Sequence, residues 1–182
     1  MLDDFDLVLT RARAGSAEAF ERIYRDLARP VAAYVRGGGV RDVDDVVSEV
    51  FLAVFTGLDR FTGDQGQFRS WVFTIAHRRL VDGWRRTART GVHIPYEQGD
   101  DHRTTPAAED GALTALGQDR VLALLETLTD EQRDVLVLRV VADLTVDQVA
   151  VVLGKRPGAV KALQRRGLAT LREALSKEGV TL

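Results

Sequence analysis

Apolar residues along the chain recur at intervals of three and four, which is the repeat of an amphipathic helix. No segment alternates apolar and polar residues over the length of a strand between turn signals. We therefore predict an all-α protein. The expected helices cover roughly residues 16–36, 42–57, 67–89, 112–126, 130–142, 146–153 and 157–175.

Polar residues and glycines mark where several of these helices begin and end. The run Gly37–Gly39 is expected to end the first helix, because glycine readily adopts the conformation that follows a helix. Thr129 with Gln132 and Thr145 with Gln148 have the spacing of a capping box, in which each side chain satisfies an amide of the first turn. Two short helices joined by tight turns are therefore expected in the second half.

The aromatic residues divide the chain into two parts. All twelve lie within the first 96 residues, so two cores of different construction are expected. Residues 97–110 carry five acidic residues against one arginine, in a stretch where glycine and proline recur, which is typical of an exposed linker. We predict two small helical domains joined by a flexible acidic linker, with a helix-turn-helix in the second. The expected ranges are 1–90, 91–111 and 112–182.

The charge is unevenly distributed. The 182 residues are 45% hydrophobic and 29% charged, which is the composition of an ordered, soluble protein, and the net charge of −2 argues against a generally basic nucleic-acid binder. However, residues 68–91 hold six Arg and one Asp, and residues 154–172 hold six basic residues and no acid. Two cationic segments are therefore embedded in an acidic chain, where nucleic-acid binding remains possible.

Several function classes are disfavoured by what the sequence lacks. The chain has no cysteine, which removes disulfides, thiolate zinc sites and thiol redox sensing. The N-terminus is acidic and no run of 18 apolar residues occurs, so we expect no membrane insertion and a cytoplasmic location. No phosphate-binding glycine loop, nucleophile elbow or metalloprotease motif is present. We expect no enzyme activity, no cofactor and no metal site.

Residues 144–175 have the layout of a helix-turn-helix. A short apolar helix ends at Gly154, and Pro157 suits the first turn of the next helix, where its missing N–H costs nothing. Lys161, Gln164 and Arg165 lie off the apolar stripe of that second helix, where they could enter a major groove. A solvated cationic face on an ordinary helical hairpin is the alternative interpretation. The turn chemistry and the absence of acids favour DNA.

Two other segments also allow more than one interpretation. In residues 68–86 aromatic rings alternate with arginines, a mixture that can hold unpaired bases, although Phe73 and Trp84 could equally be core residues. In residues 42–55, Asp42, Asp45 and Glu49 lie on one side of a helix, but no histidine sits at metal-ligand spacing to them. For Asp42 and Asp44 the alternative is capping and dipole compensation at the helix start, and the functional interpretation is an acidic face that meets a basic partner.

These segments, in this order, resemble the extracytoplasmic-function group of the sigma-70 family of bacterial RNA polymerase sigma factors. The resemblance extends from about Ala19 to Leu175. Residues 42–55 resemble region 2.2 of the family and residues 68–86 resemble regions 2.3 to 2.4. Regions 4.1 and 4.2 correspond to residues 128–140 and 144–175.

The resemblance implies an alternative sigma factor that binds core RNA polymerase and directs promoter-specific transcription initiation. It would recognise the −35 and −10 elements and help to open the −10 region. Its polymerase partners would be the β′ clamp and the β flap. Three residues match the pattern of the clamp-binding helix: Asp45, Glu49 and Phe51.

The resemblance also implies two sets of DNA-contacting residues. The −10 element, single-stranded when open, would be held by Phe61, Phe68, Arg69, Trp71, Arg78, Arg79, Asp82, Arg85 and Arg86. The −35 duplex would be read by Lys155, Arg156, Pro157, Gly158, Lys161, Gln164 and Arg165. Two positions depart from the family pattern, since Arg78 replaces the usual Asn and Arg156 replaces the usual Ser or Thr cap.

Regulation by an anti-sigma protein is expected, because the family is commonly controlled in that way and the sequence offers no sensing site of its own. One alternative is an operator-binding regulator that uses its helix-turn-helix without polymerase. The aromatic and arginine mixture of residues 68–86 argues against it, because a protein that binds only duplex DNA has no need for it. A helical protein-interaction module without a DNA role is a third hypothesis.

Overall fold

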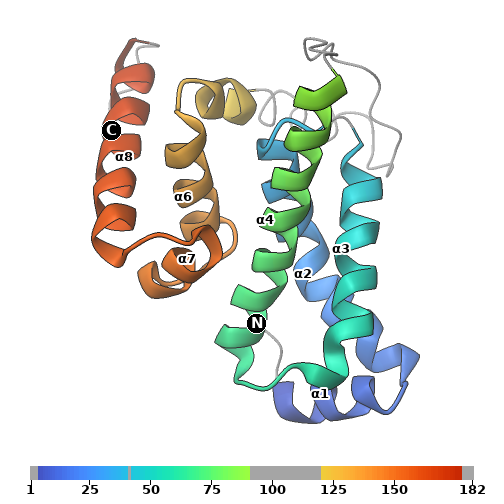
Figure 1. The fold of residues 1–182 in the computed structure, drawn as a ribbon. Coiled ribbons are helices and arrows are strands. Elements are labelled where there is room, and N and C mark those ends of the chain that lie inside the picture. Colours follow the sequence, from blue (N-terminus) through green and yellow to red (C-terminus); the bar gives the residue numbers. More distant parts are fainter. Residues whose placement is uncertain (1–3, 41, 91–119, 178–182) are drawn as a thin grey trace, which may run out of the picture.

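The computed structural model describes residues 4–40, 42–90 and 120–177, and all regular structure in these ranges is helical, which confirms the all-α prediction. Figure 1 shows that the helices form two neighbouring groups, α1 to α4 and α6 to α8. In chain order they are α1 (Phe5–Arg13), α2 (Ala17–Gly37), α3 (Val43–Gly57), the short 3₁₀-helix η1 (Leu58–Arg60), α4 (Gln65–Thr90), α6 (Asp130–Val140), α7 (Val146–Leu153) and α8 (Pro157–Lys177).

The expected helix boundaries agree closely with those of the structure. Helix α7 matches its expected range, and α8 continues two residues beyond the expected end at residue 175. Of the helix expected at 112–126, the described part covers residues 120–126. The linker expected at 91–111 lies outside the described residues.

Both capping boxes are present and position the helix-turn-helix. Thr129 and Thr145 each accept a hydrogen bond from the amide three residues on, and the glutamine there reaches back to the threonine amide. Helix α7 ends at Gly154, whose φ of 62° is the left-handed conformation that glycine adopts without strain. The direction in which α8 leaves the turn therefore depends on local sequence chemistry.

Helix α1 was not expected. Its buried residues, Phe5, Val8, Leu9 and Ala12, have the spacing of one helix face, but the acidic residues around them hide the pattern. Arg13 at its end donates from Nε to the Leu58 carbonyl at 3.2 Å and from Nη2 to the Phe61 carbonyl. The helix thus fixes the segment that connects α3 to α4.

The two halves of the chain are packed against each other along what we call the seam, the contact surface between residues 4–90 and 120–177. In Figure 1 α7 lies beside α4, and the contacts pair α7 with α4 and α6 with α2. One cluster of buried side chains runs through both halves, where the aromatic distribution led us to expect two cores. Val137 of α6 and Leu125 are in van der Waals range of Gly37 of α2, so apolar packing continues from one half into the other.

None of the described helices combines the length and the apolar character that crossing a lipid bilayer requires.

The capping box of α7 can be tested by Thr145→Ala. We expect a loss of about 0.5–2 kcal/mol in the free energy of unfolding, because the amide of Gln148 loses its hydrogen-bond acceptor. Thr170→Ala is the control, since that exposed hydroxyl bonds to the Arg166 carbonyl within α8 and caps nothing. Urea denaturation measures both, and equal stability of the two variants would contradict the assigned cap.

Candidate nucleic-acid interface

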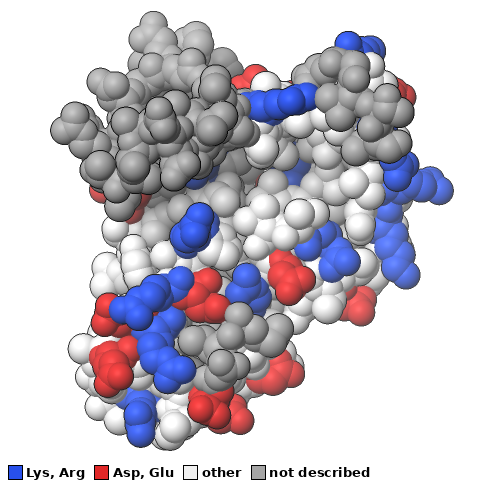
Figure 2. Space-filling view, turned by 180° about the vertical axis from the view of Figure 1, so that it is seen from behind, with Lys and Arg blue, Asp and Glu red and all other residues white. Residues whose placement is uncertain are grey.

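Helix α8 is held on the C-terminal half by its apolar face and turns its basic face outward. Val160 and Leu163 are buried, and Gly167 lies so close to α6 that an added Cβ would be 2.9 Å from Leu136 Cδ1. Figure 2 shows Lys and Arg side chains gathered along the edge of the molecule where α8 lies. Within the cationic segment 154–172, the exposed basic residues are Arg156, Lys161, Arg165, Arg166 and Arg172.

The seven residues assigned to the −35 duplex lie together around the turn and the first half of α8. Pro157 and Gly158 are exposed at its start, and Gln164 is half-buried. Lys155 is held by Glu131 of α6 at 2.5 Å, and this hydrogen bond, with the lysine charge, lowers the pKa of the Glu131 carboxyl. The cationic surface therefore has Lys155 fixed at one edge, and the exposed basic residues lie beyond it.

The aromatic rings of the −10 set form a core cluster. Phe61 and Phe68 are 8% and 1% exposed, and their ring centroids are 5.1 Å apart in an edge-to-face contact. Trp71 stacks on Phe61 at 5.2 Å, and Phe5 of α1 packs on Phe68 at 5.5 Å. In this structure Phe61 and Phe68 are therefore buried among neighbouring rings.

The segment between α3 and α4 is rigidly framed by this cluster. At Gly57 an added Cβ would lie 2.9 Å from Trp71, so only glycine lets the tryptophan pack there. The amides of Asp64 and Gln67 each donate to the other residue's side chain, at 2.9 and 2.8 Å, and so cap α4. The segment at about residues 59–67 is therefore a preformed loop.

The polar members of the −10 set divide between two places. Arg78, Asp82, Arg85 and Arg86 are exposed on the second half of α4, and Arg79 lies 3.6 Å from Glu49. Arg69 instead lies in the seam. Sequence reasoning grouped Arg69 with the others because it shares their segment, and only the packing separates it from them.

Trp84, which the sequence left open between core and surface, is 37% exposed on α4. Its indole Nε1 donates a hydrogen bond to the Gly38 carbonyl at 2.9 Å. Phe73, the other open case, is fully buried. Phe73 is thus a core residue, whereas Trp84 is a partly exposed ring beside the exposed arginines of α4.

Helix α3 presents a mixed acidic and apolar face. Asp45 and Glu49 are exposed, whereas Phe51 is 4% exposed, with its ring centroid 4.6 Å from that of Tyr24. The apolar residues open to solvent are Leu52, at 64%, and Phe55, at 51%. The resemblance did not include these two residues among the polymerase contacts. Large apolar residues that lie outside the buried stripe of a helix indicate a surface open to a partner, and this signal could have identified them.

A polar cluster lies where α2, α4 and α6 meet. The hydroxyl of the buried Tyr34 and Nδ1 of His77 are 2.8 Å apart and share a hydrogen bond. Burial raises the pKa of Asp134 to about 6, while the Arg133 charge and the Tyr34 hydroxyl act in the opposite direction. Burial, and then the Lys155 charge, lower the pKa of His77, and burial followed by the Asp134 charge raises that of Tyr34.

The described residues hold no group of three or more His, Asp or Glu arranged to bind a metal ion.

Two family models match the chain and together cover more than half of it. Residues 19–90 match the model described as Sigma-70 region 2, and residues 118–171 match the one described as Sigma-70, region 4. The first match contains the loop, α3 and α4, and the second contains the helix-turn-helix.

Two curated relatives are similar along almost the whole chain. The ECF RNA polymerase sigma factor BldN of Streptomyces coelicolor is 33% identical over 171 residues, which is 92% of this chain and 64% of BldN. The chain thus spans about two thirds of that relative. The ECF RNA polymerase sigma factor SigD of Mycobacterium tuberculosis is 31% identical over 180 residues, 96% of this chain and 85% of SigD.

A solved structure shares the arrangement of both halves. The structure of CnrH in complex with the cytosolic domain of CnrY matches with a TM-score of 0.70 and 26% sequence identity. The match covers 96% of this chain and 99% of that one.

The raised pKa of Asp134 can be tested by Asp134→Asn. Stability from the protonated carboxyl is present below its unfolded pKa and is lost as the pH rises through the folded pKa of about 6. We expect the variant to be more stable than the wild type at pH 7.5, by on the order of 1–3 kcal/mol, and the gain to shrink as the pH falls toward 4.

The measurement is the melting temperature of both proteins from pH 4 to 7.5. The titration of His77 is common to both, so it cancels in the difference. Asp59→Asn, at an exposed carboxyl of η1, is the control and should shift little. A difference between wild type and Asp134→Asn that does not depend on pH would contradict the assignment.

Proposed function

The chain belongs to the extracytoplasmic-function group of the sigma-70 family, and on that premise we propose how its residues divide the work of promoter-specific initiation. It binds core RNA polymerase, places its two halves on the −35 and −10 elements, and helps to open the −10 region. The observation that carries this proposal is the exposed basic face of α8 behind a glycine turn, in a chain whose other half matches region 2.

The polymerase-binding surface in this proposal is centred on Leu52 and Phe55 of α3. Their exposed apolar side chains supply the desolvated centre of an interface, and Asp45 and Glu49 supply its charged rim. Phe51 supports the surface from below through its contact with Tyr24, which is itself 44% exposed. This assignment replaces a direct contact by Phe51 with one by its neighbours.

Replacing both exposed residues, Leu52→Ala with Phe55→Ala, tests the surface. We expect the affinity for core polymerase to fall about tenfold or more, because central apolar side chains carry most of the binding energy of an interface. Leu7→Ala is the control, since Leu7 is another exposed leucine, 49% exposed, on α1. Fluorescence titration of labelled protein with core polymerase measures both, and equal affinities would contradict the surface.

For the −10 element we propose that the preformed loop receives an extruded base and that the exposed arginines of α4 hold the phosphates. Phe61 and Phe68 pack beneath the loop and hold its conformation, and Arg13 of α1 anchors it by a hydrogen bond to the Leu58 carbonyl. Extruding a base costs a few kcal/mol, and a preorganised pocket offsets that cost without further ordering. Arg78, Arg85 and Arg86 are the phosphate contacts.

For the −35 element we propose that α8 enters the major groove with its first half. Lys161 and Arg165 are one helical turn apart on the exposed face, and Gln164 lies beside them. Arg156 and the turn at Gly154 lie where the DNA backbone would pass. Lys155, held by Glu131, positions the turn and becomes a phosphate contact only if that ion pair breaks.

The substitutions Lys161→Ala and Arg165→Ala test this reading of the −35 element. A residue that contacts a base edge should cost about 1–3 kcal/mol on the preferred sequence, and a phosphate contact should instead reduce the salt dependence of binding. Lys177→Ala, at the far end of α8, is the control. Run-off transcription with reconstituted holoenzyme, on promoters selected in vitro, measures the effect.

Two results would count against the proposal. Unchanged transcription in both variants would remove α8 from −35 recognition. Tight and specific binding of operator DNA by the isolated chain would favour the alternative of a regulator that acts without polymerase.

We further propose that the protein performs no chemistry of its own and acts in the cytoplasm, where polymerase and promoter DNA are. Its contribution is recognition, and the polymerase forms the phosphodiester bonds. CnrH, which shares the arrangement of both halves, was solved with the cytosolic domain of another protein bound. That complex supports control of this chain by an anti-sigma protein that binds both halves together.

A further inference from the structure

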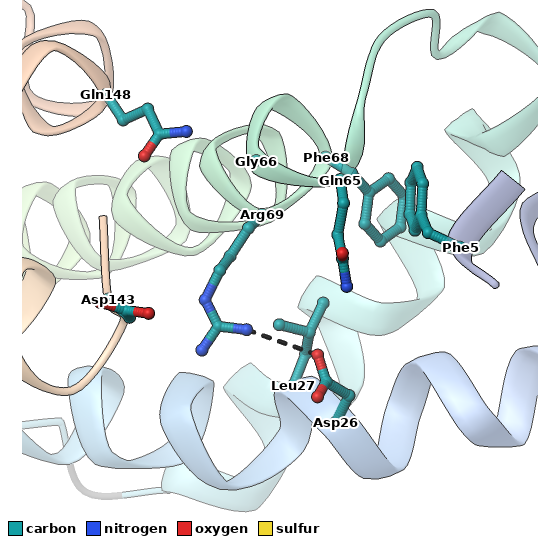
Figure 3. A pocket seen from close by; sticks show the side chains of 9 residues that line it. All are labelled: Phe5, Asp26, Leu27, Gln65, Gly66, Phe68, Arg69, Asp143 and Gln148. Carbon is teal, nitrogen blue, oxygen red and sulfur yellow. Dashed lines mark hydrogen bonds and ion pairs between the residues drawn. The ribbon is translucent and has the colours of Figure 1, made fainter. Parts of the chain in front are cut away.

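Helix α1 contacts the preformed loop through residues at both of its ends. At its start, the Phe5 ring packs on that of Phe68, and Phe68 in turn contacts Phe61 of the loop. Figure 3 shows the Phe5 and Phe68 rings side by side. At its end, Arg13 donates hydrogen bonds to the carbonyls of Leu58 and Phe61. One helix therefore holds the loop by an aromatic contact and by a polar one.

Arg13 binds the backbone on both sides of the point where helical structure gives way to the loop. Leu58 begins η1, directly after α3, and Phe61 follows η1 with an extended backbone at φ −71° and ψ 134°. Helix α3 has no basic residue in its last turn, so Arg13 supplies from another helix the positive charge that a helix C-terminus favours. The two hydrogen bonds thus fix the direction in which the loop leaves the helix.

The remainder of the loop is closely determined once its start is fixed. Gly63 has a φ of 148°, and an added Cβ there would collide with the side chain of Gln67. The reciprocal hydrogen bonds of Asp64 and Gln67 fix the far end. Arg60 and Thr62 lie between the two fixed ends and have exposed side chains. The placement of these two side chains therefore depends on both ends of the loop.

The guanidinium group of Arg13 serves the loop backbone alone. Among the residues that the structure describes, no acidic side chain pairs with it, and both of its hydrogen bonds go to main-chain carbonyls. Arg11 lies in the same last turn of α1, yet its exposed side chain makes no hydrogen bond or ion pair with the described residues. The two arginines differ in what they hold, which makes Arg11 a matched control.

We propose that Arg13 is a positioning residue for recognition of the −10 element. It holds the preformed loop so that Arg60 and Thr62 meet the extruded base in one orientation. Helix α1 thereby takes part in −10 recognition, although it lies before residues 19–90, which match region 2. The proposal rests on the proposed function for the base that is recognised, whereas the support of the loop by Arg13 is a property of the isolated chain.

A loop that is fixed before binding affects selectivity as well as affinity. It presents the same donors and acceptors to every base, so a base that does not match them leaves polar groups unpaired. A loop released from Arg13 can rearrange around a mismatched base, and it has to be ordered at each binding event. Loss of Arg13 should therefore weaken the preference between −10 sequences. The preference between −35 sequences should stay the same, because α8 reads that element.

Hydrogen exchange in the isolated chain tests the support of the loop. Arg13→Gln removes the charged donor, and Arg11→Gln makes the same substitution two residues earlier. We expect the amides of Phe61 and Asp64, which are hydrogen-bonded within the loop, to exchange about tenfold faster in Arg13→Gln. The wild type and Arg11→Gln should exchange alike. Equal exchange in both variants would overturn the support of the loop by Arg13.

Transcription with reconstituted holoenzyme tests the effect on selectivity. Three promoters are compared: a preferred one, the same promoter with one −10 base changed, and the same promoter with one −35 base changed. In Arg13→Gln the ratio of preferred to −10-changed transcription should fall severalfold, and the −35 ratio should equal that of Arg11→Gln. A purely structural loss lowers the amount of folded protein and leaves both ratios unchanged. Unchanged ratios would therefore overturn the positioning role.

Arg13→Lys separates positioning from a direct contact with DNA. Lysine keeps the positive charge but cannot replace donors on two separate nitrogens. We expect its −10 ratio and its loop exchange to resemble those of Arg13→Gln, whereas full restoration by lysine would show that the charge acts on DNA directly and would overturn positioning. Failure of the wild-type holoenzyme on every promoter would overturn the proposed function. An active holoenzyme with an unchanged −10 ratio in Arg13→Gln would overturn the role of Arg13 alone.

Discussion

Helix α4 packs against helices of both halves of the molecule, and the rest of the structure depends on this double packing. Phe68, Val72, Phe73, Ala76 and Leu80 are buried at helical spacing and close the N-terminal bundle. The neighbouring face, with Gly66, Arg69 and His77, meets the C-terminal half. The exposed arginines occupy what remains. One helix therefore carries a core stripe, a seam and a candidate DNA surface, and a substitution on one face need not disturb the others.

The seam is unusual in mixing a continuous apolar core with ionisable groups. Asp134 stays half-buried at a cost in stability that is largest at neutral pH, because burial raises its pKa to about 6. Arg69 donates across the seam to the Ala142 carbonyl and pairs with Asp26 within its own half. Such groups favour one arrangement of the halves without making it very stable. The acidic remainder of the chain, set against two cationic segments, also weakens non-specific binding to DNA by the isolated protein.

Much of the fold and part of the site follow from local chemistry. The capping residues Thr129 and Thr145, with Gly154 and Pro157, determine where the second half turns, because each acts on backbone groups within four residues of itself. The outward placement of Lys161 and Arg165 follows from the apolar stripe of α8. By contrast, α1 escaped notice because Asp6 interrupts its apolar pattern and two further acidic residues precede it, although its buried positions were spaced correctly.

By itself the sequence determined the helices, their caps, the helix-turn-helix and the segregation of charge, since all of these depend on residues close together in the chain. Only the tertiary structure decided which side chains are available. Phe51, Phe61 and Phe68 lie in the core while Leu52 and Phe55 face solvent, and Arg69 crosses the seam while Arg78 does not. The reason is physical: exposure and pairing depend on which distant helix covers a face, and periodicity within one helix carries no information about its neighbour.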